Sequence, residues 1–425
     1  MATFSTAQST RVAHLLAVAQ AEFSAHGYDH VSIDGIARAA SVSKETIYRH
    51  FTDKRALFEA AIESLRAEFS VRVAETAGSD TVADEEAVAR IVRLIYDSAN
   101  VGGYLSATWL SVASMRFFPD LAERLHDEGL RRIEPIRAAL AARAAALGIA
   151  GDVMPAHAGD LGAMAVEGTR TIMGWPALEG AERDAHARAV AHLFLHGCAT
   201  DAPSPPLAPS FPAPEQGAAP LPPPAPRADH IALLMATARR HFDAHGYRGA
   251  SLDAIGVEAR VGRGTLYRHF DGKAGLFEAV MLDEAHAVAA ELAATLPALA
   301  PDEEPAVVLP GFAAAAGAVL AGPRSVALHR IVIAEARRAP RLARQVHAAT
   351  RLPAMLPLTD YLAAGAVARR FRLNDADWHA RQFLTLAGEG NRPLTRRAQA
   401  SPDERARTAR RAVATFLSGY TAALG

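Results

Sequence analysis

The sequence predicts an all-α protein, and three observations lead to this fold class. Alanine, the residue with the highest helix propensity, is abundant throughout the 425 residues, whereas aromatic residues make up 6%. Apolar residues recur with the 3.6-residue period of an amphipathic helix in several stretches. No stretch sustains the two-residue alternation of a half-buried strand. We therefore expect helices wherever the chain is not rich in proline.

The N-terminal region begins with two predicted helices. Apolar residues of 10–26 follow a helical period that stops at Gly27, a residue that commonly ends helices. Ser32 then precedes a short helical stretch, 33–40, and its hydroxyl is well suited to accept from the first backbone N–H groups.

Two further helices follow after a tight turn at residues 41–42. Ser43 is the predicted N-cap of 44–51, and Asp53 that of 54–69. The second of these helices carries an apolar stripe on one face, formed by Leu57, Phe58, Ala61, Ile62 and Leu65. Two short helices joined by a tight turn within a four-helix region predict a helix-turn-helix layout.

The chain contains this region twice. The segment 23–60 aligns without a gap on 242–279, so that "TIYRHFTDKRALFEA" returns as "TLYRHFDGKAGLFEA". Weaker matches continue to the end of each half, and we infer that a whole half was duplicated. Between the halves, 201–227 holds 11 of the 25 prolines and predicts an extended linker.

Composition and charge narrow the class of protein. The formal net charge is −1, so any nucleic-acid site must depend on local charge. One cysteine, Cys198, excludes an intrachain disulfide, and the N-terminus lacks the pattern of a signal peptide. The most apolar segment, 311–322, is too short to span a bilayer. We expect a cytoplasmic protein that does not enter membranes, and the absence of nucleophile-elbow and phosphate-loop motifs indicates that it is not an enzyme.

We also expect no metal and no other cofactor. His192 and His196 are spaced to share a metal on one helix face, with Cys198 close in sequence. However, no carboxylate lies within four residues of either histidine, and Thr415 and Gly419 stand at the matching positions of the second half in the sequence alignment.

Both copies of "AHGY…TIYRHF/TLYRHF…LF" resemble the TetR family of bacterial transcriptional regulators, and "VIAEARRAPRLARQ" (332–345) resembles the AcrR-like branch of that family. The resemblance implies two units fused in one chain, each with a helix-turn-helix domain followed by a helical ligand-binding and dimerisation domain. The expected divisions are 1–65 for the first DNA-binding domain, 66–200 for the first C-terminal domain, 201–227 for the linker, 228–284 for the second DNA-binding domain and 285–425 for the second C-terminal domain.

The resemblance also implies which residues bind DNA. We call the two DNA-binding domains, 1–65 and 228–284, the first and second heads. In the first head the candidates are Ser32, Ser43, Lys44, Glu45, Thr46, Tyr48, His50 and Lys54. In the second head they are Ser251, Arg263, Gly264, Thr265, Tyr267, His269 and Lys273. The N-terminal residues of a recognition helix point into the major groove, so the base-reading pair changes from Lys44-Glu45 to Arg263-Gly264.

An apolar or aromatic effector is expected in the C-terminal domains, because members of the family bind such molecules there. The candidate residues are Trp109, Met115, Phe117, Met164, Met173 and Trp175, for which core packing is the competing explanation. For Glu167 with Arg170, and Glu389 with Arg392, a structural ion pair is favoured over ligand binding.

The predicted function is a sequence-specific regulator that binds a double-stranded operator, most simply a repressor released by its effector. Three arrangements remain open: a monomeric pseudo-dimer that uses both heads, a homodimer with four heads, and a second half that acts only in dimerisation or sensing.

Overall fold

A computed structural model describes residues 6–78, 85–100, 104–115, 117–149, 155–199, 201–203, 205–206, 229–396 and 398–420. These residues form helices and connecting turns. Ala199 and Phe371 also pair in an isolated antiparallel β-bridge. The all-α expectation is confirmed for this part of the chain. Most of the predicted linker lies outside the described residues.

The first half contains ten α-helices in the described part of the chain: α1 (Thr6–His26), α2 (Ile33–Ala39), α3 (Lys44–His50), α4 (Lys54–Gly78), α5 (Glu85–Asn100), α6 (Tyr104–Ser114), α7 (Pro119–Arg132), α8 (Glu134–Ala146), α9 (Pro155–Ala165) and α10 (Gly180–His196). Two 3₁₀ turns accompany them, η1 (Tyr28–His30) and η2 (Thr171–Met173).

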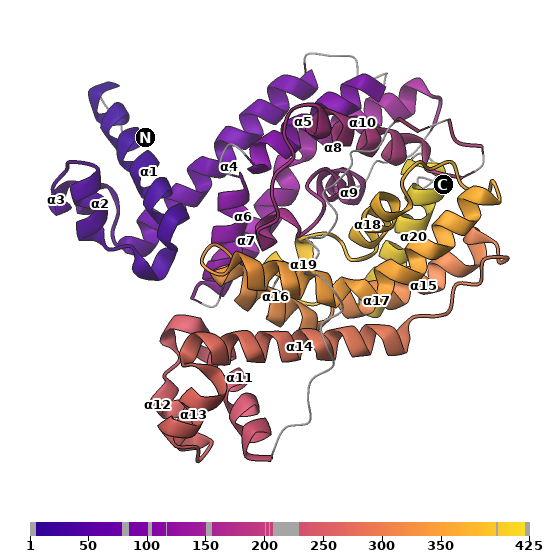
Figure 1. Cartoon of the computed structure of the whole chain (residues 1–425). Helices are drawn as coiled ribbons and strands as arrows, with labels where there is room; N and C mark the ends of the chain where they lie inside the picture. The colour runs from indigo at the N-terminus through magenta and orange to yellow at the C-terminus, as the bar shows by residue number, and fades with distance from the viewer. Residues whose placement is uncertain are drawn as a thin grey trace.

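The second half, within the described residues, repeats this order: α11 (Asp229–Gly249), α12 (Leu252–Glu258), α13 (Arg263–Phe270), α14 (Lys273–Thr295), α15 (Pro305–Leu320), α16 (Pro323–Glu335), α17 (Pro340–Val367), α18 (Ala376–Ala387), α19 (Arg392–Thr395) and α20 (Pro402–Ser418). The long helix α17 occupies the sequence interval that α7 and α8 occupy in the first half. Figure 1 shows α1–α3 and α11–α13 projecting from the same side of the molecule.

The predicted caps of the N-terminal region are present. Ser32 accepts from Gly35 N at 3.0 Å, and Asp53 accepts from Ala56 N at 2.7 Å. The backbone at Gly27 has φ 77° and ψ 165°, a conformation that is essentially restricted to glycine, and Gly246 repeats it with φ 65° and ψ 178°. The chain therefore turns with a similar backbone conformation after α1 and after the part of α11 that precedes Gly246.

Helices α4 and α14 join each helix-turn-helix region to its C-terminal domain without a break. The stripe predicted on α4, from Leu57 to Leu65, is buried. Since α4 runs to Gly78 and α14 to Thr295, both helices pass through the domain boundaries expected at 65 and 284. Each helix-turn-helix region is thus continuous with its C-terminal domain through one helix.

The two C-terminal domains pack against each other through equivalent elements. Helix α10 contacts α20, α9 contacts α18, and α6 contacts α16. The contacts at the ends of α10 and α20 are reciprocal: an added Cβ at Gly197 would lie 2.2 Å from Leu417 O, and one at Gly419 would lie 2.1 Å from Leu195 O. Reciprocal contacts between matching residues characterise a two-fold interface.

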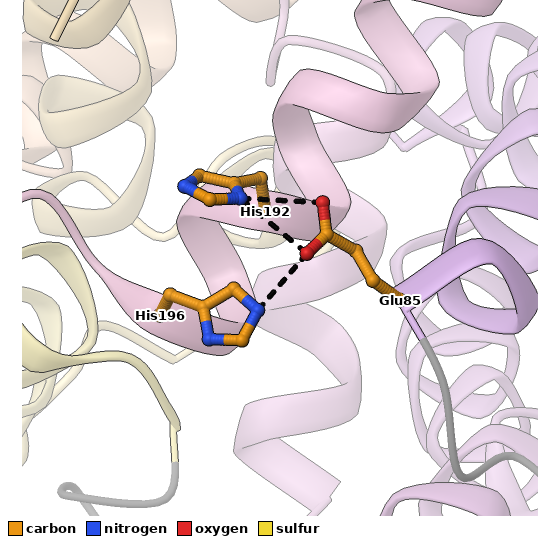
Figure 2. A group of neighbouring side chains, drawn as sticks. All are labelled: Glu85, His192 and His196. Carbon is orange, nitrogen blue, oxygen red and sulfur yellow. Dashed lines mark hydrogen bonds and ion pairs between the residues drawn. The ribbon is translucent and has the colours of Figure 1, made fainter. Parts of the chain in front are cut away.

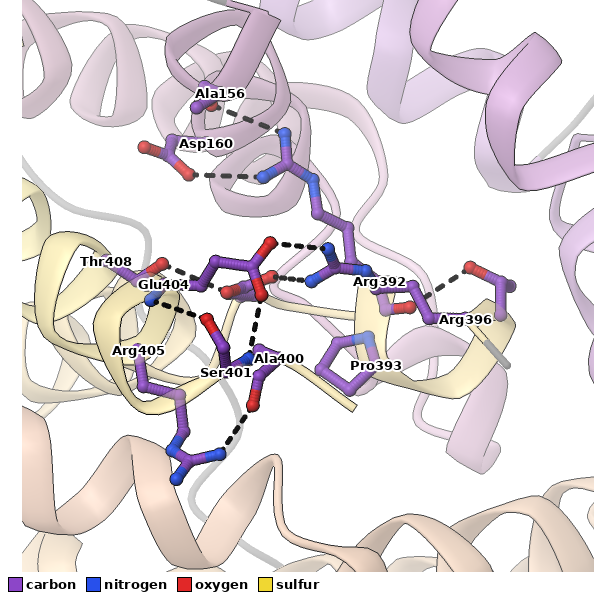
Figure 3. Close-up of polar contacts among 12 residues, drawn as sticks. Ala156, Asp160, Arg392, Pro393, Arg396, Ala400, Ser401, Glu404, Arg405 and Thr408 are labelled. Atoms are coloured by element: carbon purple, nitrogen blue, oxygen red, sulfur yellow. Dashed lines mark hydrogen bonds and ion pairs between the residues drawn. The ribbon is translucent and has the colours of Figure 1, made fainter. Parts of the chain in front are cut away.

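Polar contacts cross the same junction. Arg411 binds the buried Asp160 at 2.5 Å. Arg392 donates to Ala156 O at 3.3 Å, and its guanidinium lies 4.0 Å from Asp160 (Figure 3). Tyr420 donates to Leu140 O at 3.1 Å. Asp160, a buried carboxylate of the first half, is thus compensated by arginines of the second.

The two ion pairs expected from sequence have different outcomes. Glu167 and Arg170 are buried and lie 3.2 Å apart, as predicted. Glu389 instead accepts from the Thr408 hydroxyl at 2.9 Å, and Arg392 extends toward the first half. Arg392 therefore finds its partners across the junction between the halves, which cannot be predicted from the spacing of nearby residues.

No single helix among the described residues is long and apolar enough to cross a membrane. The bent pair α15 and α16, which meet at 53°, meets the length and composition criteria when both helices are taken together.

Candidate nucleic-acid interface

Helix α3 is anchored along one side and exposed along the other. Ile47 is fully buried beneath it, whereas the side of the helix that carries Tyr48 is open, with this residue 52% exposed. At its start, Ser43 Oγ accepts from the backbone N–H of Thr46 at 3.2 Å and lies 3.2 Å from the Thr46 hydroxyl. The helix therefore presents a fixed, polar face.

Helix α13 repeats this arrangement with a different start. Leu266 is buried, and Tyr267 is 57% exposed. The N-cap is Gly262, which offers no side-chain acceptor. Gly264 lies in open space, with no atom within 4 Å of an added Cβ, so a duplex can approach its backbone closely.

The structure leaves the predicted DNA contacts at the surface or at its edge. Those that are exposed are Ser32, Ser43, Lys44, Glu45, Tyr48, Ser251, Arg263, Gly264, Tyr267 and His269. Those that are half-buried are Thr46, His50, Lys54, Thr265 and Lys273. Ser251 caps α12 through Ala254 N at 3.4 Å, as its counterpart Ser32 caps α2.

In each head the first cation of the recognition helix pairs with an aspartate of the preceding helix. Lys44 contacts Asp34, and Arg263 makes two bonds to Asp253, at 2.7 and 2.6 Å. The matching positions are 219 residues apart in both cases. Sequence reasoning did not identify these aspartates, although Asp34 and Asp253 occupy the same position of the repeat. In this structure each cation points toward its aspartate, and both partners of each pair are more than half exposed.

The lysines at the start of α4 and α14 lie over aromatic rings. Lys54 Nζ is 4.1 Å from the ring centre of Tyr28, and Lys273 Nζ is 4.9 Å from that of Tyr247. Partial burial lowers the pKa of both lysines from the ordinary value. Lys273 also donates to Arg248 O at 3.0 Å. The rings fix the two ammonium groups beside the recognition helices.

The heads are coupled to the domains behind them. Tyr28 packs edge-to-face on Phe118 with centroids 4.7 Å apart, and Arg124 of α7 binds Glu59 of α4 at 2.7 Å. The two heads also contact each other, through His30 and Arg248. The first helix-turn-helix region is thus in contact with α7 and with the residue that precedes it.

A cavity of about 250 Å³ lies where the two halves meet. It is lined by Trp175 and Arg170 of the first half and, among others, by Arg351 and Met355 of the second. Trp175 Nε1 has no hydrogen-bond partner among the described residues. Of the six candidate effector residues, Trp175 thus lines a cavity to which both halves contribute.

The other five candidates lie elsewhere. Met115, Met164 and Met173 are buried. Trp109 donates from its indole nitrogen to Ile333 O at 2.7 Å, which places it in the junction between the halves. Phe117 is 39% exposed and contacts Tyr28.

This arrangement, two helix-turn-helix regions with exposed second helices on a helical body, defines the class of DNA-binding regulators. The sequence pattern described as "Bacterial regulatory proteins, tetR family" matches residues 15–61 and 234–280. The pattern described as "AefR-like transcriptional repressor, C-terminal domain" matches 307–422. These matches support a tandem regulator of the TetR family, with two TetR-type N-terminal regions.

Individual relatives match in shorter stretches. The DNA-binding transcriptional repressor TetR of Mycobacteroides abscessus is 43% identical over 72 residues, which is 17% of this chain and 38% of the relative. A Mycobacterium tuberculosis protein named as the mycofactocin biosynthesis regulator MftR is 42% identical over 50 residues, 12% of this chain and 25% of its own. The chain thus spans well under half the length of these relatives.

Solved structures match about one half of the chain each. A tetR-family bacterial regulatory protein from Rhodococcus RHA1 is 22% identical, with a TM-score of 0.36. The match covers 45% of this chain and 100% of the Rhodococcus protein. The flavonoid-responsive regulator FrrA is 27% identical, with coverage of 37% and 78% and a TM-score of 0.33.

Proposed function

We propose that the chain is a sequence-specific transcriptional regulator that works as a single-chain pseudo-dimer. The observation that carries this proposal is the reciprocal packing of Gly197 and Gly419 at the ends of α10 and α20. Matching residues of the two halves occupy each other's surface, as the two subunits of a symmetric dimer would. One polypeptide therefore supplies two heads in a fixed relation.

The heads would read two different half-sites. Arginine at the start of α13 donates bidentately to guanine O6 and N7, the commonest specific contact in the major groove. Lys44 can donate to the same atoms, and the exposed Glu45 can accept from cytosine N4. Because the Asp34 and Asp253 carboxylates already contact the cations, a base would compete with an aspartate for some of the same N–H donors. The operator would then be an imperfect palindrome with centres about one helical turn apart.

Repression with release by an effector is the mode of regulation we propose. The effector would occupy the cavity at the junction, because residues of both halves line it. Its Arg351 is half-buried, donates to the Thr169 hydroxyl at 2.8 Å, and forms no ion pair with a carboxylate among the described residues. Burial lowers the pKa of Arg351 to about 10, so its side chain stays charged at neutral pH. An aromatic molecule that bears an anionic or acceptor group would satisfy Arg351 and the Trp175 indole nitrogen together.

Such a molecule would act by favouring one arrangement of the halves over another. The cavity is lined by η2-flanking residues of the first half and by α17 and α18 of the second. Filling it would change how the halves pack, and α4 and α14 would carry that change to the heads.

Two other arrangements are consistent with the same family. Whole chains could pair and present four heads, or the second half could serve dimerisation and sensing alone. Selection of binding sites from a random duplex library, followed by footprinting, separates these possibilities. The pseudo-dimer predicts one asymmetric site with two unlike half-sites. A symmetric site, or a site that holds a single half-site, would contradict it.

A further inference from the structure

Three metal-ligand side chains converge at the C-terminal end of α10. His192 and His196 project from successive turns toward the carboxylate of Glu85, the first described residue of α5 (Figure 2). His192 Nδ1 lies 3.2 Å from Glu85 Oε1, and His196 Nε2 lies 3.0 Å from Oε2. The carboxylate that is missing from the local sequence thus comes from a residue 107 positions earlier in the chain.

We propose that Glu85, His192 and His196 form a binding site for one first-row divalent transition-metal ion, of the Zn²⁺ type. Two imidazoles with one carboxylate are donors that zinc and its neighbours accept, whereas Mg²⁺ and Ca²⁺ prefer all-oxygen sites. Two donors that each bind one zinc ion at about 2.0–2.1 Å, at tetrahedral angles, lie roughly 3.3 Å apart. The separations of 3.2 and 3.0 Å between the nitrogen and oxygen atoms are close to this value.

The other ring nitrogen of His192 supports the assignment. Its Nε2 is 3.3 Å from Pro203 O, a carbonyl that can only accept, so Nε2 carries the hydrogen. In the neutral imidazole Nδ1 is then an acceptor that faces the Glu85 carboxylate, another acceptor. Either a proton or a metal ion must then lie between Nδ1 and the carboxylate, and a metal ion would satisfy both acceptors at once. An N–H held by a backbone carbonyl is also the usual support of a metal-bound histidine.

The site is accessible and tolerant of a fourth ligand. The side chains of His196 and Glu85 are 27% and 37% exposed, whereas that of His192 is 5% exposed. Three protein ligands leave one tetrahedral position for water. An ion here would connect the start of α5, the end of α10 and the chain at Pro203, beside the Gly197 contact between the halves.

The duplication offers an internal comparison. In the second half, where Gly419 matches Gly197 in the structure, Ala414 and Ser418 occupy the positions of the two histidines, in place of the Thr415 and Gly419 expected from the sequence alignment. The proposal therefore predicts one ion per chain and not two. A second histidine pair with the same spacing, His241 and His245 on α11, lies near Glu258, to which His241 bonds at 2.7 Å. This pair serves as a matched control.

The test is a titration of chelator-treated, full-length protein with Co²⁺ and then Zn²⁺. We expect the protein to bind one equivalent of Co²⁺ and to show the visible absorption bands of Co²⁺ with a low coordination number. One equivalent of Zn²⁺ should then displace the Co²⁺ and remove these bands. Glu85→Gln and His196→Gln, both at partly exposed positions, should each weaken binding at least about tenfold, while the double variant H241Q/H245Q binds as the wild type does.

Three results would overturn the proposal: no uptake by the wild type, unchanged affinity in both Glu85→Gln and His196→Gln, or loss of the ion in H241Q/H245Q. Circular dichroism confirms that each variant is folded. An independent readout comes from the wild type alone, whose melting temperature should rise with Zn²⁺ and fall back with chelator. A melting temperature that does not respond to Zn²⁺ would also count against the site.

Discussion

Replacing Gly419 by alanine should open the joint between the two halves. The backbone there has φ 81° and ψ 170°, a region that costs a non-glycine residue about 1–3 kcal/mol. The new Cβ would lie 2.1 Å from Leu195 O, so the ends of α10 and α20 must separate. Separation endangers the bonds from Cys198 N to Phe416 O and from Ala199 N to Leu417 O, both 2.9 Å long, at about 1 kcal/mol each. The expected loss is about 3–5 kcal/mol of unfolding free energy.

The assay is urea denaturation, combined with operator binding measured by fluorescence anisotropy. Gly148→Ala is the matched control, because Gly148 also has a positive φ, of 73°, but no atom lies within 4 Å of an added Cβ. It should lose about 1 kcal/mol through backbone strain alone. We expect Gly419→Ala to lose operator affinity as well, because its heads are no longer held in register. If Gly419→Ala is no less stable than Gly148→Ala, the close approach of α10 and α20 does not hold the halves together.

Three further outcomes follow from the same contacts. Arg263→Ala should relax discrimination at one base pair of one half-site by about 1–3 kcal/mol, and Lys44→Ala should act on the other half-site; loss at both half-sites from either variant would show that the heads do not read separately. Trp175→Phe removes the unpartnered indole N–H and should weaken the effector at least about fivefold in a release assay, with operator affinity unchanged; full effector sensitivity would place the effector elsewhere. Acid should destabilise the fold. Burial lowers the pKa of three histidines in the folded protein, to about 3 for His329, to about 4 for His379 and well below the ordinary value for His347. These imidazoles therefore stay neutral in the fold, whereas the same histidines of the unfolded chain take up protons below pH 6.5. Urea denaturation from pH 7 to pH 5 should show stability falling by about 1 kcal/mol per pH unit for each histidine below pH 6.5, and a flat profile would refute this.

Local chemistry made the helix-turn-helix regions predictable. Ser32, Ser43 and Asp53 stand directly before the helices that they cap, and an N-cap depends on its own few neighbours. The stripe from Leu57 to Leu65 repeats with the helical period, which identifies a buried face without knowledge of what covers it.

Contacts between distant segments could not be read in this way. Glu85 meets His192 because α5 packs on α10, and nothing near either residue in the sequence marks the other. Arg392 reaches Asp160, a residue of the other half, although a local partner was expected. Asp253 was the nearest to being predictable, since a helix-turn-helix places the first turn of one helix beside the start of the next. The presence of an aspartate, Asp34, at the same position of the first repeat could have indicated this pairing.

The most direct test of the single-chain pseudo-dimer is the mass of the complex in solution, measured by light scattering with and without the selected operator. We expect one chain of 44.9 kDa alone and one chain per duplex. Binding should be lost when either Tyr48 or Tyr267 is replaced by alanine, because each side chain is exposed on a recognition helix, where we propose that it contacts DNA. Two chains per duplex, or binding that is indifferent to Tyr267, would contradict the proposal that one chain supplies both heads.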